Sequence, residues 1–97
     1  MTRIILADAV RRDLERIADH LRTHDAANID VRLKSILATL RVLRLSPEIG
    51  RPLLNGLREF LIGRGQHGYL ALYDYDDDDD SVLVLRIRAQ RERGYVD

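Results

Sequence analysis

Residues 68–95 read GYLALYDYDDDDDSVLVLRIRAQRERGY, and this stretch decides how the chain folds. Residues 69–75 and residues 82–89 are rich in Val, Leu, Ile and Tyr, which are the residue types favoured in β-strands. Because only a short run of aspartates joins these two segments, we predict an antiparallel hairpin.

The second strand of this hairpin presents two different surfaces, because alternate residues of a strand point to opposite faces of a sheet. One surface is apolar throughout and is predicted to be core: Leu83, Leu85, Ile87 and Ala89. The other begins apolar and ends in two arginines: Val82, Val84, Arg86 and Arg88. We expect another molecule to be recognised on this second surface and on the arginine-rich tail that follows it.

Upstream of the hairpin the sequence predicts a strand, two helices and a further strand. Residues 3–7 (RIILA) form a short apolar strand, and Asp8 can cap the helix that follows. A second helix begins near Asn28 and ends at Ser46 and Pro47, because a residue before proline disfavours the helical region. Residues 57–62 (LREFLI) are the next strand. The helices carry apolar residues at helical spacing, which are predicted to cover the core face of the sheet: Leu14, Ile17, Leu33, Ile36, Leu40 and Leu43.

The predicted order of elements is therefore β-α-α-β-β-β. It corresponds to the α+β class, with a helical hairpin packed on one face of an antiparallel sheet. The 97 residues are enough for a single domain, which we place at residues 1–97.

Composition excludes several classes of protein. The chain has no cysteine, which rules out a disulfide framework and a thiolate metal site. Its apolar runs are far shorter than the roughly 20 residues that span a bilayer. The N-terminal sequence MTRIILADAVRRD becomes charged too early for a signal peptide. We expect a cytoplasmic protein without a membrane partner.

The formal net charge of zero conceals an uneven distribution. Fifteen of the sixteen basic residues are arginines, and six of the sixteen acidic residues lie between Asp74 and Asp80. The C-terminal strand and tail are therefore basic, whereas the hairpin turn is strongly acidic.

Neither the aspartates nor the histidines predict a metal site, and nothing in the sequence indicates a cofactor. A calcium-binding EF-hand loop counted from Asp74 needs Gly at its sixth position and Glu at its twelfth, but Asp79 and Leu85 stand there. His20 and His24 are one helical turn apart, but no third ligand accompanies them. We expect a solvated turn and a surface helix.

The tyrosines and arginines of the hairpin suggest two kinds of partner. Tyr69, Tyr73 and Tyr75 alternate along the first strand, and next to Arg86 and Arg88 they could stack bases and bind phosphates. The same residue types anchor protein interfaces, so we favour a protein partner.

The chain resembles toxins of the RelE/ParE superfamily from bacterial type II toxin–antitoxin modules, and within it the ParE-like, plasmid-stabilisation branch. The matching pieces occur in order along nearly the whole sequence: the opening strand, the helical hairpin, PEIGRP (47–52), LRE (57–59), GYLALY (68–73), VLRIRAQRE (84–92), Gly94 and Tyr95. The resemblance implies a small cytosolic toxin that a cognate antitoxin neutralises by wrapping a flexible segment around it.

The branches of this superfamily differ in their targets. RelE-like members cut messenger RNA in the ribosome with basic residues on the sheet and a C-terminal tyrosine or histidine, whereas ParE-like members are associated with inhibition of DNA gyrase. This chain has no lysine in its predicted strands, and Ala89 stands where many relatives with this C-terminal motif carry histidine. We therefore expect a non-enzymatic gyrase inhibitor. A ribosome-dependent messenger-RNA endoribonuclease and a non-toxic interaction module remain the alternatives.

Each reading assigns its own site residues. The residues predicted to bind the target lie on the C-terminal strand and tail: Arg86, Arg88, Arg91, Arg93 and Tyr95. The residues predicted to bind the antitoxin are Arg58, Tyr69, Tyr73 and Tyr75. The candidate catalytic residues of a ribonuclease are Arg64, His67, Arg86, Arg88, Glu92 and Tyr95. Because arginine stays protonated, Glu92, His67 or Tyr95 would have to carry out the proton transfers.

Overall fold

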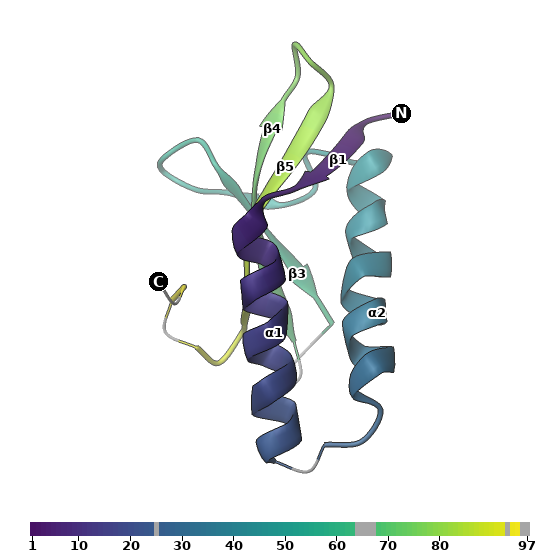
Figure 1. The fold of residues 1–97 in the computed structure, drawn as a ribbon. Coiled ribbons are helices and arrows are strands. Elements are labelled where there is room, and N and C mark those ends of the chain that lie inside the picture. Colours follow the sequence, from purple (N-terminus) through teal and green to yellow (C-terminus); the bar gives the residue numbers. More distant parts are fainter. Residues whose placement is uncertain (25, 64–67, 93, 96–97) are drawn as a thin grey trace.

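A computed structural model describes residues 1–24, 26–63, 68–92 and 94–95, in which two helices cover one face of a five-stranded sheet (Figure 1). The strands are β1 (Arg3–Leu6), β2 (Arg51–Pro52), β3 (Arg58–Ile62), β4 (Tyr69–Asp76) and β5 (Ser81–Ala89). The helices are α1 (Asp8–Thr23) and α2 (Ile29–Leu40), and α2 continues into a short 3-10 helix, η1 (Arg41–Arg44). The strand order in the sheet is β1-β5-β4-β3-β2. None of the helices in these ranges has the length and apolar character needed to cross a membrane.

The predicted α+β class and the helical hairpin on one face of the sheet are confirmed. The sheet is mixed rather than wholly antiparallel, because β1 lies parallel to β5, with Arg3 opposite Ser81 and Leu6 opposite Val84. The two-residue strand β2 was not predicted. Asp8 does not cap α1, since Ala7 occupies the cap position. The Asp8 carboxylate instead lies in the first turn, where its negative charge interacts favourably with the positive end of the helix dipole.

A β-bulge in β5 overturns part of the predicted strand register. Leu72 of β4 pairs with Arg86 and Tyr73 pairs with Val84, so Leu85 is an extra residue that pairs with no residue of β4. An extra residue reverses which side chains face the core beyond it. Val82, Val84 and Ile87 are fully buried beneath the helices, whereas Leu83 and Leu85 are only half-buried. The prediction that Leu83 and Leu85 belong to the core is therefore wrong, and that of Ile87 is confirmed.

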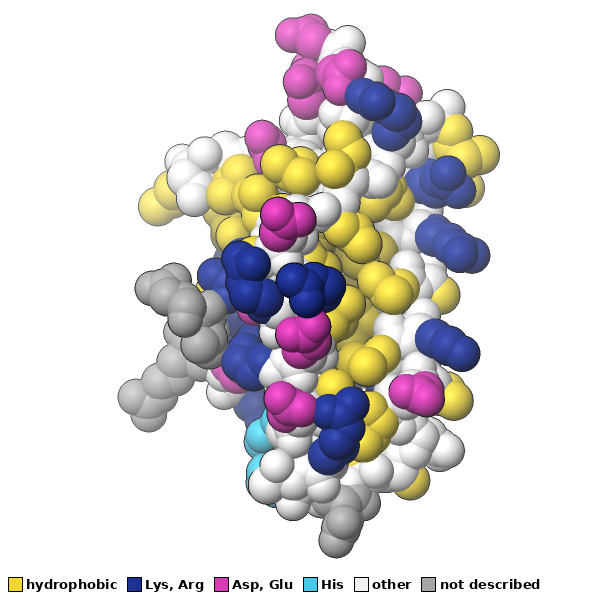
Figure 2. All heavy atoms as spheres, viewed as in Figure 1, with side chains coloured by type: hydrophobic (Ala, Val, Ile, Leu, Met, Phe, Trp, Pro, Cys, Tyr) yellow, Lys and Arg dark blue, Asp and Glu magenta, His cyan; other side chains and the backbone are white. Residues whose placement is uncertain are grey.

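The helices contribute most of the predicted core residues. Four are buried: Ile17, Ile36, Leu40 and Leu43. Leu14 and Leu33 are half-buried and pack against the edge of this core. On the side seen in Figure 2, apolar side chains are visible between the two helices.

Tyr73 is the largest fully buried side chain of the core. Its hydroxyl donates to the carbonyl oxygen of Pro47 (2.7 Å) and accepts from the N–H of Gly50 (2.8 Å). A Cβ at position 50 would lie 2.6 Å from a ring carbon of Tyr73, so glycine is needed there. The tyrosine thus holds the loop before β2 against the sheet.

Asp13 joins α1 to the sheet. β1 pairs with β5 only as far as Val84, so the backbone N–H of Ile87 faces outward from an unpaired strand edge. The Asp13 carboxylate accepts from this N–H (2.9 Å) and from Nε and Nη2 of Arg86 (2.8 and 2.9 Å). Burial by itself would raise the pKa of Asp13, but these hydrogen bonds and the charges of Arg86 and Arg16 outweigh it and hold that pKa below the ordinary aspartate value.

The acidic turn between β4 and β5 is tied to the N-terminus and stands at the top of Figure 2. Arg3 forms an ion pair with Asp79 (2.6 Å), and the Thr2 hydroxyl donates to Asp80 (2.7 Å). The Asp76 carboxylate accepts from the N–H of Asp78 within the turn (3.1 Å). These contacts fit the predicted solvated turn, with its carboxylates used to order the hairpin.

The bulge predicts an asymmetric response to truncation within β5. Val84→Ala should lower the free energy of unfolding by about 2 kcal/mol, because two enclosed methyl groups are lost and a cavity remains. Leu85→Ala should cost less than about 1 kcal/mol despite removing more atoms, because Leu85 is half-buried at the bulge. Urea denaturation of both variants measures this. A larger loss in Leu85→Ala would mean that β5 has the regular, unbulged register.

Asp13→Asn should lower stability by about 3 kcal/mol, because Arg86 loses the charge of its buried partner. The matched control is Asp19→Asn on the same helix, whose exposed pair with Arg22 should contribute less than about 1 kcal/mol. Since the folded-state pKa of Asp13 is lowered, its contribution is present above about pH 4 and is lost as the pH falls toward that pKa. Chemical denaturation across this range should therefore show a shallower acid decline in Asp13→Asn, and parallel profiles would refute the assignment.

Candidate functional site

The sheet has a second face, turned away from the helices, which we call the open face. The register places Glu59 opposite Leu72, and Leu72 opposite Arg86, on this face. Leu70 and Arg88 form the next pair along β4 and β5. The face is partly apolar, since Leu61 remains 47% exposed next to these charged side chains.

Four charged residues gather around Tyr95 on the open face, and we call these five residues the Arg–Tyr cluster: Arg51, Glu59, Arg86, Arg88 and Tyr95. The tail turns back after β5, so that the Tyr95 ring lies near both guanidinium groups. The ring centroid is 5.6 Å from Cζ of Arg86 and 5.3 Å from Cζ of Arg88, within the range of cation–π contact. Arg88 also donates from Nη1 to the carbonyl oxygen of Glu92 (2.5 Å), which fixes the turn of the tail.

Glu59 is the acidic centre of the Arg–Tyr cluster, and only 9% of its side chain is exposed. It accepts from the Tyr95 hydroxyl at 2.9 Å and from Nη2 of Arg51 at 3.1 Å. Nη2 of Arg88 lies 3.8 Å from the same carboxylate. Burial first, and then the hydrogen bond to Glu59 and its negative charge, raise the pKa of Tyr95 well above its ordinary value despite the nearby Arg88.

The Arg–Tyr cluster borders a shallow groove of about 630 Å³ at the edge of the sheet, with Arg51 and Arg88 among its lining residues. Its lining combines these charged residues with apolar ones, which include Ile49, Leu61 and Leu70. A mixed surface of arginine, tyrosine and aliphatic side chains is suited to binding a protein segment.

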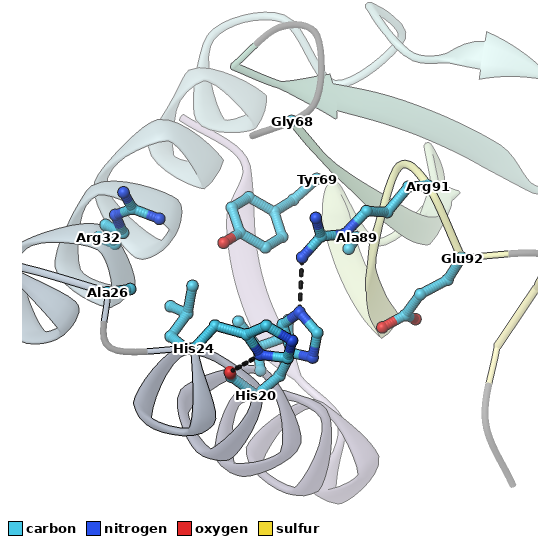
Figure 3. Close-up of a pocket in the computed structure, with 11 residues that line it drawn as sticks. His20, His24, Ala26, Arg32, Gly68, Tyr69, Ala89, Arg91 and Glu92 are labelled. Atoms are coloured by element: carbon cyan, nitrogen blue, oxygen red, sulfur yellow. Dashed lines mark hydrogen bonds between the residues drawn. The ribbon is translucent and has the colours of Figure 1, made fainter.

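The structure unites only part of the predicted target-binding set. Arg86, Arg88 and Tyr95 meet in the Arg–Tyr cluster, as the preceding distances show. Arg91 instead turns toward α1 and donates from Nη2 to Nε2 of His20 at 2.6 Å (Figure 3). Arg93 lies outside the described residues. The tail is therefore not one continuous basic arm, because its arginines face different elements.

The candidate ribonuclease residues are divided in the same way. Glu92 forms an ion pair with Arg16 of α1 and borders the pocket next to His20, whereas the Tyr95 hydroxyl donates to Glu59. Arg64 and His67 lie outside the described residues.

The predicted antitoxin contacts require a correction. Tyr73 is 0% exposed and both of its hydroxyl contacts are internal, so it offers no surface to a partner. Tyr69 and Tyr75 are half-buried on the helix-covered face of the sheet, not beside the two arginines of β5 as expected. Arg58 shares that side and donates to the carbonyl oxygens of Glu48 and Gly50 (2.8 and 2.9 Å). The three tyrosines alternate along β4 and therefore lie on the same face of the sheet, which is the face that the helices cover.

Two residues of the Arg–Tyr cluster were missed among the predicted site residues: Arg51 and Glu59. A signal for Glu59 was present, because a charged residue within the apolar strand LREFLI needs a partner when the strand is packed. No sequence signal could have paired it with a tyrosine 36 positions away.

A known protein family matches nearly the whole length of the chain. The family described as "ParE toxin of type II toxin-antitoxin system, parDE" matches residues 4–94. No curated protein matches the chain.

Two solved structures are similar in fold. A chain of the chromosomal ParDE toxin–antitoxin system from P. aeruginosa is 19% identical, with a TM-score of 0.74 over 92% of this chain and 96% of that one. A chain of the toxin–antitoxin complex RelBE2 from Mycobacterium tuberculosis is 23% identical, with a TM-score of 0.63 over 92% of this chain and 98% of that one. The family match, which covers all the helices and strands described above except the first residue of β1, shows that this protein belongs to the ParE toxin family of type II toxin–antitoxin systems.

Proposed function

We propose that this chain is the toxin of a toxin–antitoxin pair, that it inhibits DNA gyrase by binding through the Arg–Tyr cluster, and that it catalyses no reaction. The family and the fold support the toxin role. The choice of a binding mechanism over a catalytic one comes from the cluster itself.

The state of the Tyr95 hydroxyl is the observation that carries this proposal. Cleavage of RNA by attack of its 2′-hydroxyl needs a base to remove a proton and an acid to supply one. The Tyr95 hydroxyl is committed as a donor to Glu59, and its raised pKa makes the phenolate inaccessible near neutral pH. Arg86 and Arg88 can stabilise negative charge but cannot act as bases.

The pairing of the arginines also favours protein binding. Arg86 is neutralised by Asp13, and Arg88 shares Glu59 with Arg51. A phosphate backbone would have to compete with these carboxylates, whereas a protein surface can use the arginine planes, the tyrosine ring and the apolar groove together.

A ribosome-dependent endoribonuclease is the second candidate, and one observation favours it. A C-terminal tyrosine lies over two arginines on the open face, which is the arrangement that the RelE-like resemblance implies. The two candidates differ in what they require of the Tyr95 hydroxyl, and this difference can be measured.

We further propose that a cognate antitoxin covers the groove between α1 and α2. The groove has an apolar floor and charged rims, with Leu14, Ala18 and Leu33 below and Arg11, Glu15, Asp19 and Arg22 around them. Apolar side chains are exposed along it in Figure 2. An amphipathic antitoxin segment would pair its apolar residues with this floor and its charges with the rims.

Tyr95→Phe should leave gyrase inhibition within about threefold of the wild-type chain, because the ring and its contacts with the arginines are retained. Arg88→Gln should weaken inhibition at least about tenfold, as expected for an arginine anchor at an interface. Arg12→Gln on the exposed side of α1 is the matched control and should have no effect. Supercoiling by purified gyrase and cleavage of messenger RNA on programmed ribosomes are measured in parallel.

The two assays separate the candidates cleanly. Ribosome-dependent cleavage that is lost in Tyr95→Phe would replace the gyrase proposal with the ribonuclease. Equal inhibition of gyrase by Arg88→Gln and by Arg12→Gln would remove the Arg–Tyr cluster from the binding surface.

Leu33→Ala should weaken antitoxin binding about tenfold, since its side chain forms part of the groove floor. Val31→Ala is the control on the same helix, because Val31 is 64% exposed and is not part of the groove lining. Calorimetric titration of the cognate antitoxin into each variant gives the affinities, and circular dichroism checks the fold. If Val31→Ala weakens binding as much as Leu33→Ala does, the groove is not the docking site.

A further inference from the structure

A pocket of about 380 Å³ lies between the C-terminal half of α1, the start of α2, the start of β4 and the turn that follows β5 (Figure 3). It is separate from the Arg–Tyr cluster, and none of the functions discussed above uses it. Polar residues on its walls include His20, His24, Arg32, Tyr69 and Arg91. Its volume falls within the range of small-molecule sites, which is roughly 300–1,000 Å³.

The two arginines of this pocket lack acidic partners among the residues that the structure describes. Arg91 donates to the uncharged acceptor His20 Nε2, and the side chain of half-buried Arg32 has no hydrogen bond or ion pair there. Eight other arginines of the described chain pair with carboxylates: Arg3, Arg11, Arg16, Arg22, Arg51, Arg58, Arg86 and Arg88. Among the described residues that line the pocket, Glu92 has the only carboxylate, and Arg16 already pairs with it. The pocket therefore has an excess of positive charge.

The other residues that line the pocket indicate what the uncharged part of a ligand would be. Ile17, Leu21 and Ala89 provide apolar surface. Figure 3 shows the Tyr69 ring between Arg32 on the side of α2 and Arg91 on the side of the tail. A flat or short apolar group could pack there while an anionic group meets a guanidinium.

We propose that this pocket binds a small organic oxyanion, a molecule with a phosphate or carboxylate head and a compact apolar body. Arg32 and Arg91 supply the charge, and the imidazole of His20 supplies a further donor when protonated. The site is independent of the toxin's target, so it stands or falls separately from gyrase inhibition.

His20 makes binding sensitive to pH. The pocket wall partly desolvates His20, and the neighbouring His24 and Arg91 add positive charge, so the pKa of His20 lies below its ordinary value. In the part of the chain that the structure describes, the charged and titratable groups around it are Arg16 and His24 of α1, Arg32 of α2, Tyr69 of β4, and Arg91 and Glu92 of the tail. A bound anion offsets the positive charges and favours the imidazolium, so the ligand's affinity should rise as the pH falls from about 8 to about 6.

The test uses the purified full-length chain with phenyl phosphate, benzoate and phenol as probes. Calorimetry should show saturable binding of at least one anion and none of phenol, and the imidazole resonances of His20 and His24 should shift with the same midpoint. Arg32→Gln and Arg91→Gln should each weaken the anion about tenfold, and Arg12→Gln should not. Comparison of phenyl phosphate with benzoate identifies the preferred head group.

Three results would overturn the proposal. They are the absence of saturable binding by both anions, equal affinities in Arg32→Gln and the Arg12→Gln control, or binding of an acidic peptide in place of both small anions. Circular dichroism of each variant ensures that a lost affinity reflects the pocket rather than the fold.

Discussion

The Asp13 carboxylate, with its three hydrogen bonds to β5, is the interaction on which the functional part of the molecule depends. β1 covers only the first half of β5, so the second half would have a free backbone edge without α1. A helix cannot offer a backbone ladder to a strand, because its own N–H and C=O groups are used internally. The side-chain carboxylate of Asp13 accepts from the Ile87 N–H in place of a neighbouring strand. It also neutralises Arg86 and fixes the position of its guanidinium group.

A series of contacts across the open face of the sheet links Arg86 to the other residues around Tyr95. The guanidinium held by Asp13 forms one side of the Tyr95 site, Arg88 forms another, and Glu59 receives the phenolic hydroxyl. The tail is consequently part of the folded surface at Tyr95, although nothing in its composition predicts burial. Because every member of the Arg–Tyr cluster has a partner, the cluster is preorganised for contact and poorly supplied with proton acceptors. This is the physical basis for preferring inhibition by binding over catalysis.

Charge compensation distinguishes the two basic regions of the chain. On the open face the arginines are matched by Glu59 and Asp13. In the pocket by His20 the two arginines face an imidazole and apolar walls instead. A chain with zero net charge can therefore contain a local excess of positive charge, because the balancing aspartates are concentrated at the distant hairpin turn. The lack of acidic partners for these two pocket arginines is the reason why we propose an anion site there.

Local sequence determined the helices, every strand except the two-residue β2, their order along the chain, and the family. Apolar periodicity predicted both helices, turn residues delimited the strands, and the tyrosine-rich and arginine-rich segments of the hairpin indicated where a surface of interest would begin. Tertiary structure decided the rest. One bulged residue, Leu85, exchanged which side chains of β5 face the core, and periodicity cannot detect such an insertion, because the strand remains apolar on both sides of it. The hydrogen bonds that join Arg86 to Asp13, Arg91 to His20 and Tyr95 to Glu59 each span at least 36 residues. Their roles therefore depend on how the helices and strands are brought together rather than on any local pattern.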